Sequence, residues 1–354
     1  MAYQNVGTPR FYINIPEWLA SSGVSPLSGF ENHLRTLPVK METREDISFT
    51  LKGMTVNGFV AILGHTMKSD ASNSTEFYNI RIGSNAVTLY DIINTEDSVG
   101  NNKPPHNGFS IAKFIGYDTI DNCYFTGGIT KVGSIVIGTY YDIPHSPELN
   151  LTMTREMDGV NRIRTKGGND LINYKYTKSP LWGDTLAPWE LGISSATYKN
   201  TVYQRYSRVG RRTWDLSFSH LDGNDVFGSN QSLGVPMNSE NPPTAYAPIY
   251  TGGNMTGGSY PFEGYEEGDL YLQNEGQSNE YSAGFNYNLL TDNNFFSQVI
   301  HKTNGGQLPF IFQPDNNNNN PDNFAICKLD MDTFKFDQVA NGVYNIKLKI
   351  REVW

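Results

Sequence analysis

The apolar residues of this chain recur at alternate positions in many short segments, which is the two-residue period of a half-buried β-strand. Turn-rich stretches such as residues 98–108 separate these segments. Several short strands spaced roughly 8–12 residues apart, or slightly more, are typical of a β-sandwich or jelly roll. Residues 51–150 are therefore predicted to form one compact β-sandwich, with strands at Val60–Leu63, Tyr78–Ile82, Ala86–Tyr90, Ser110–Ile115 and Ser134–Tyr141.

The same alternation continues in residues 151–354 and is clearest in Thr213–His220 and in the closing segment Val343–Trp354. The closing segment is expected to be tied into a sheet, so its truncation should impair folding. In Thr213–His220 the large apolar residues fall on one face and the polar ones on the other, namely Trp214, Leu216 and Phe218 against Thr213, Asp215 and Ser217. Further strands are predicted at Leu149–Arg155, Arg162–Thr165, Leu171–Tyr176, Pro309–Gln313 and Phe324–Asp330.

One short helix is predicted in this second unit, over Asp292–Lys302, with Asp292 as its N-cap and a glycine pair just beyond its end. A helical turn is also expected near Pro16–Ala20. Residues 226–288 are rich in Gly, Asn, Pro, Tyr and Ser, which predicts a long loop insertion or a segment that becomes ordered against a neighbour.

The predicted organisation is therefore all-β. An N-terminal arm and the strands that follow it occupy residues 1–50, and the β-sandwich occupies residues 51–150. A second β-rich sandwich or split barrel, with the one short helix and the loop insertion, occupies residues 151–354.

The charge distribution disfavours nucleic acid as a partner. The formal net charge is −9 and no block of Lys and Arg occurs, whereas phosphate binding usually requires a basic stripe. No apolar run approaches the roughly 20 residues that span a bilayer, so membrane insertion is not expected. The first ten residues lack the pattern of a secretory signal, which favours synthesis in a cytoplasm.

Candidate catalytic chemistry is sparse in the sequence. No two of the six histidines lie three or four residues apart, and no nucleophile elbow, P-loop or dinucleotide fingerprint occurs. Asp215, Asp222 and Asp225 are the natural carboxylates for a glycosidase, but they are expected on the polar face of a strand and in a turn. No catalytic, cofactor-binding or metal-binding residue is therefore predicted, and the chain is expected not to be an enzyme.

Two groups of residues are candidates for binding. Arg205, Arg208, Arg211 and Arg212 form the one notable basic cluster, and it is interpreted either as an intersubunit contact or as a solvated loop that leads into a strand. Trp182 and Trp189 are candidates for stacking on sugar rings, and equally for anchoring a core or an interface.

Several segments together resemble tail-tip or baseplate proteins of tailed bacteriophages. Two of them resemble the start and finish of a galactose-binding-like sandwich embedded in virion proteins, at Asn57–His65 and Gly133–Leu149. The others are Gly210–Ser219, Gly306–Gln313 and Lys349–Trp354. The resemblance implies a distal-tail or baseplate subunit, made in the host cytoplasm and located in the virion tail. It also implies a homo-oligomeric ring around the tail tube, often sixfold, that contacts other tail proteins and connects to the parts that recognise the host.

Other functions stay open at the level of sequence. A receptor-binding or glycan-binding module of the virion surface would recognise a host-surface glycan through exposed Trp or Tyr. A neck protein or capsid decoration protein is a further structural alternative. A glycan-cleaving enzyme would require two carboxylates facing each other across a cleft.

Overall fold

The computed structural model describes residues 6–21, 34–37, 42–43, 47–63, 78–82, 85–86, 90–93, 95–96, 102–103, 109–127, 131–156, 160–174, 211–227, 293–319 and 323–353. Strands make up 52% of these residues and helices are few. The chain is therefore all-β with sandwich character, as the alternation predicts. Of the helices in the described part of the chain, none has the length and apolar character needed to cross a membrane.

Fifteen of the described strands belong to one antiparallel sheet. The order of the strands along its main path is β12-β15-β19-β17-β16-β1-β11-β3-β9-β4-β8-β7. Three further strands pair with members of this path: β18 with β19, β5 with β4, and β6 with β9. The first half in sequence comprises β1 (Arg10–Asn14), β3 (Ile47–Leu63), β4 (Tyr78–Ile82), β5 (Asn85–Ala86), β6 (Tyr90–Ile93), β7 (Thr95–Glu96), β8 (Asn102–Lys103), β9 (Phe109–Gly127) and β11 (Ser134–Asp142). The second half comprises β12 (Thr152–Glu156), β15 (Arg211–Asp222), β16 (Phe310–Gln313), β17 (Ala325–Leu329), β18 (Phe336–Ala340) and β19 (Val343–Glu352).

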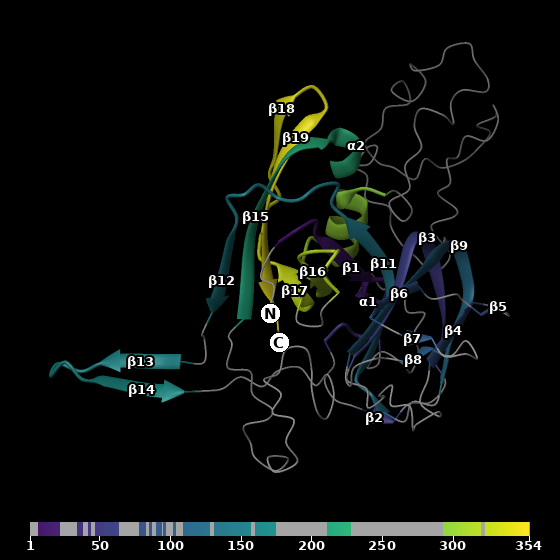
Figure 1. Cartoon of the computed structure of the whole chain (residues 1–354), viewed down its shortest axis with the longest axis horizontal. Coiled ribbons are helices and arrows are strands. Elements are labelled where there is room, and N and C mark those ends of the chain that lie inside the picture. The colour runs from purple at the N-terminus through teal and green to yellow at the C-terminus, as the bar shows by residue number, and fades with distance from the viewer. Residues whose placement is uncertain are drawn as a thin grey trace, which may run out of the picture.

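Two further pairs of strands lie outside this sheet. One pair joins β2 (Glu42–Thr43) to β10 (Lys131–Val132), and the other joins β13 (Val160–Arg164) to β14 (Asp170–Tyr174). Figure 1 shows the first-half strands β3, β4 and β9 on one side of the molecule and β12, β15, β18 and β19 on the other.

Strand β1 connects the two sides, although it comes from the predicted N-terminal arm. It pairs antiparallel with β11 on one edge and with β16 on the other, so that Arg10 lies opposite both Asp142 and Gln313. One sheet therefore runs through residues from all three predicted regions. The domain boundaries themselves, and the galactose-binding-like relationship, stay predictions.

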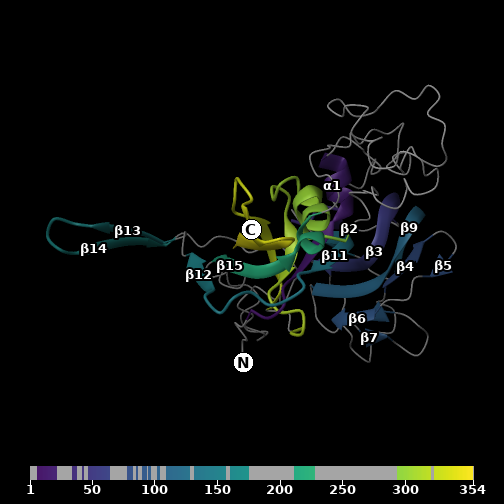
Figure 2. The same cartoon turned by 90° about the horizontal axis from the view of Figure 1, so that it is seen from above.

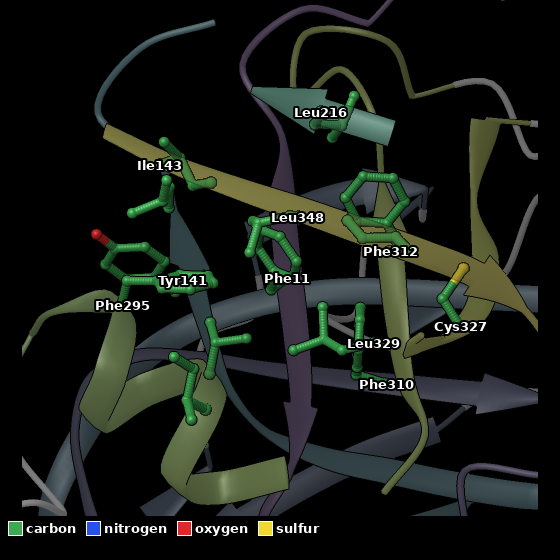
Figure 3. Packing of buried hydrophobic residues seen from close by; sticks show 14 of the residues in the cluster. Phe11, Tyr141, Ile143, Leu216, Phe295, Phe310, Phe312, Cys327, Leu329 and Leu348 are labelled. Carbon is green, nitrogen blue, oxygen red and sulfur yellow. The ribbon is translucent and has the colours of Figure 1, made fainter. Parts of the chain in front are cut away.

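Both faces of the sheet are buried around β1. Phe11 and Ile13 contribute to a core on one face, whereas Tyr12 contributes to a core on the other. Phe11 packs against Phe310 and Phe312, with ring centroids 5.5 and 5.3 Å apart. Figure 3 shows these rings beside side chains from β15, β17 and β19 and from the helical segment that closes this core.

Two strands are longer than their sequence patterns predict. The predicted strand Val60–Leu63 is only the end of β3, and the predicted strand Ser110–Ile115 lies at the beginning of β9. The reason is that β3 and β9 pair with each other along most of their length, with irregularities between Phe49 and Leu51 and between Met54 and Asn57. This pairing between distant segments carries the strands through stretches in which the alternation is weak.

The strands β15 and β19 confirm the predicted alternation. Trp214, Leu216 and Phe218 are each only 1% exposed, whereas Asp215 is exposed. Thr213 is the exception, because it was assigned to the polar face and is buried. Its hydroxyl donates to Glu156 Oε1 at 3.4 Å, and this neighbour on β12 covers it.

The helix α1 (Ile15–Ser21) confirms the turn expected near Pro16. In place of the regular helix predicted over residues 292–302, the structure has the π-helix η4 (Phe296–Ile300) followed by the 3₁₀ turn η5 (His301–Thr303). The backbone N–H of Ser297 donates to Asn294 Oδ1 at 2.8 Å, so Asn294 caps this segment. The predicted cap, Asp292, lies outside the described residues.

Candidate assembly surface

The basic cluster predicted from the sequence is described in part. Arg211 and Arg212 begin β15, between β12 and β19, whereas Arg205 and Arg208 lie outside the described residues. The two tryptophans considered for glycan stacking, Trp182 and Trp189, also lie outside them, as do residues 228–288 of the predicted insertion. The predicted roles of these undescribed residues stay predictions.

Arg212 forms a buried ion pair within the chain. Its Nη2 lies 3.1 Å from Glu352 Oε1, and its Nε donates to Glu352 Oε2 at 3.2 Å. Its backbone N–H donates to the same Oε2 at 2.8 Å, and Nη2 also donates to the carbonyl oxygen of Phe324 at 2.9 Å. The guanidinium lies over the ring of Trp214, 5.2 Å from its centroid. Arg212 thus links β15 to the end of β19, and an additional contact with a neighbour stays a prediction.

A second ion pair lies beside the first. Arg351 donates through Nη2 and Nε to Glu156 Oε2, at 2.6 and 3.0 Å, and both side chains are about one-third exposed. Burial, and then the positive charge of Arg212, lower the pKa of Arg155 in the same region. The two carboxylates Glu156 and Glu352 therefore compensate a crowded group of arginines at this end of β12, β15 and β19.

Another ion pair fastens β1 to β11. Arg10 Nε and Nη2 donate to the two carboxylate oxygens of Asp142 at 2.5 and 2.7 Å, and the guanidinium lies 4.5 Å from the ring centroid of Tyr140. Burial acts to lower the pKa of Arg10, but the hydrogen bond to Asp142 and nearby negative charge outweigh it, so this pKa is raised. The pair stabilises the seam between the two halves of the sheet.

Of the carboxylates considered for glycosidase chemistry, one is exposed to solvent and another caps a short helix. Asp215 is exposed on β15, and Asp222 accepts a hydrogen bond from the Asn224 backbone N–H at 2.8 Å. Asp222 thereby caps the short helix α2 (Gly223–Val226), as its place in a predicted turn suggests. Within the described ranges, no group of three or more His, Cys, Asp and Glu side chains is arranged to hold a metal ion.

Three large apolar side chains are exposed on the β13–β14 hairpin, and two of them are the most exposed large apolar side chains in the described strands. Ile163, Leu171 and Ile172 are 64%, 62% and 46% exposed. Figures 1 and 2 show that this hairpin extends away from the large sheet. Its turn is ordered by its own hydrogen bonds, because the Thr165 N–H donates to the Asn169 carbonyl oxygen at 2.8 Å and the Gly168 N–H donates back to the Thr165 carbonyl oxygen at 3.0 Å.

The sequence predicted both strands of this hairpin but not their exposure. The alternation that places Ile163 and Leu171 on one face is the same alternation that marks a strand packed on a core. Only the position of the hairpin outside the sheet distinguishes the two cases.

Comparison with known protein families, with curated proteins and with solved structures found no match.

Proposed function

We propose that this protein is a non-enzymatic structural subunit of a larger assembly. The observation that carries this proposal is the β13–β14 hairpin, which extends from the sheet and exposes three large apolar side chains. An isolated two-stranded hairpin is marginally stable in water. Exposed apolar side chains on such an element gain stability when another surface covers them.

The arrangement of charges supports a structural role over a catalytic one. In the described part of the chain, three of the buried or half-buried carboxylates, Asp142, Glu156 and Glu352, each bind an arginine from another strand of the large sheet. Such pairs hold strands together, whereas a glycosidase needs two carboxylates that face a substrate cleft.

The identity of the assembly rests on the sequence resemblance. We propose a virion component of a tailed bacteriophage, specifically a distal-tail or baseplate subunit that forms a ring around the tail tube. Its partners are copies of itself and other tail proteins, and it connects the tube to the parts that recognise the host.

The oligomeric mass of the full chain tests the self-assembly in this proposal. Light scattering over a hundredfold range of concentration should give a discrete multiple of the 39.6 kDa chain, and negative-stain electron microscopy should show closed particles of one size. A chain that stays monomeric at every concentration would refute self-assembly.

A further inference from the structure

The two faces of the β13–β14 hairpin differ in chemistry. Opposite residues in an antiparallel pair share a face, and the register places Ile163 opposite Leu171 and Asn161 opposite Asn173. One face therefore has an aliphatic pair beside a pair of amides and no charge; it is called the uncharged face below. All four of these side chains are exposed.

The opposite face carries charge. Arg162 lies opposite Ile172, and Arg164 lies opposite Asp170. Arg162 also forms an ion pair with Asp170 across the strands. Covering this face would remove water from several charged groups at a large cost in free energy. The uncharged face is therefore the one that another protein surface covers most favourably.

The charge of the hairpin is opposite to that of the rest of the chain. Residues 160–174 contain Arg162, Arg164, Lys166 and Asp170, which gives 3 − 1 = +2. Because the whole chain carries −9, the remaining residues carry −9 − 2 = −11. The hairpin is a basic element on an acidic chain, and charge complementarity favours a second copy of the same chain as its partner.

We propose that the β13–β14 hairpin docks onto a second copy of this chain through its uncharged face, while Arg162 and Arg164 stay on the opposite face and Lys166 lies in the turn at the tip. Ile163 and Leu171 become buried at the centre. The basic side chains stay partly solvated and steer the hairpin toward the acidic neighbour. This inference rests on the proposed function, because it specifies the surface through which copies of the chain associate.

The test compares two variants of the full chain in sedimentation equilibrium and light scattering over a dilution series. I163N/L171N changes the uncharged face, and I172N is its matched control on the charged face of the same hairpin. Association of I163N/L171N should be at least tenfold weaker than that of the unmodified chain, and association of I172N should stay within about threefold. Circular dichroism and the unfolding midpoint should match for all three proteins, because all three positions are exposed.

A photo-crosslinking residue identifies the partner directly. Benzoylphenylalanine at position 163 should give a covalent dimer whose linked peptides come from two copies, shown by mixing isotope-labelled and unlabelled chains. The same residue at position 172 should give little or no such product. Association should also weaken as salt rises from 50 to 500 mM, because salt screens the attraction between the basic hairpin and the acidic chain.

The outcomes separate this inference from the proposed function. If the unmodified chain assembles and I163N/L171N assembles equally well, the docking inference is wrong and self-assembly stands. If I172N is as disruptive as I163N/L171N, or if the crosslinks at position 163 lie within one copy, the assignment of the uncharged face is wrong. A chain that is monomeric throughout overturns both.

Discussion

Replacing Glu352 by Ala should destabilise the folded chain more than any exposed charge substitution. The side chains of Arg212 and Glu352 are only 12% and 4% exposed. Removal of the carboxylate eliminates three hydrogen bonds from Arg212 and leaves the positive charge of a buried guanidinium uncompensated by Glu352. Breaking a buried pair on one side costs about 3–5 kcal/mol.

Two local features set where in this range the effect falls. Arg212 keeps its hydrogen bond to the Phe324 carbonyl oxygen, which limits the loss. The charge of Arg155, however, already opposes that of Arg212, and Glu352 offsets this repulsion. We therefore expect a loss of about 3–4 kcal/mol in the free energy of unfolding.

Urea unfolding measured by circular dichroism and by tryptophan fluorescence provides the assay. The two signals should give coincident transitions, since only then is one free energy of unfolding defined. The Asp337→Ala variant is the control, because it removes a pair with Lys335 in which both side chains are largely exposed. That control should lose less than about 1 kcal/mol.

The double variant R212M/E352L distinguishes the loss of the ion pair itself from the cost of leaving one buried charge uncompensated. Replacing both charges by apolar side chains removes the uncompensated charge, so this variant should recover most of the stability lost in E352A. A loss below about 1 kcal/mol in E352A would show that the ion pair does not stabilise the fold, and the argument from burial would fail.

Two further predictions test other parts of the core. Burial, and then the charge of Lys302, lower the pKa of His301 to about 4 from an ordinary value of 6.5. The unfolded chain therefore binds a proton more readily, and stability should fall as the pH drops from 6.5 toward 4, by about 3 kcal/mol in total. His301→Gln should lose less over that window, and equal pH profiles of the urea midpoint would contradict the assignment. A Cβ on Gly138 would lie 1.9 Å from the Ile13 carbonyl oxygen. Gly138→Ala should therefore push β1 away from β11 and lower the free energy of unfolding by about 1–3 kcal/mol or more. The control Gly167→Ala, with nothing within 4 Å of its Cβ, should change the unfolding midpoint little.

Alternation predicted those strands in which one face is buried and the other is not. Trp214, Leu216 and Phe218 are examples, because a period of two is enough to specify which side chains enter the core. It did not predict the position of β1 at the centre of the sheet. The partners of β1 come from residues 134–142 and 310–313, and a local pattern contains no information about pairing over such separations.

The sequence likewise predicted only part of the candidate site. The sequence identified Arg211 and Arg212 as a notable cluster, but the partner of Arg212 lies 140 residues away. The exposure of Ile163 and Leu171 could not be predicted either, because an aliphatic residue at alternate positions normally indicates a core. In this hairpin, the described strands of the large sheet leave those side chains uncovered.

The attachment of the β13–β14 hairpin also bears on how it would bind. The hairpin follows β12, and Glu156 at the end of β12 is held by Arg351 on β19. The backbone N–H of Glu148, before β12, also donates to the Ser217 carbonyl oxygen of β15 at 2.8 Å. Strand β12, which precedes the hairpin in the sequence, is therefore fixed to the sheet, and the turn at the tip of the hairpin is fixed by internal hydrogen bonds. Such order within the hairpin lowers the entropy lost on association, so a small apolar contact made by this hairpin can contribute more to assembly than the same contact made by a loop without such hydrogen bonds.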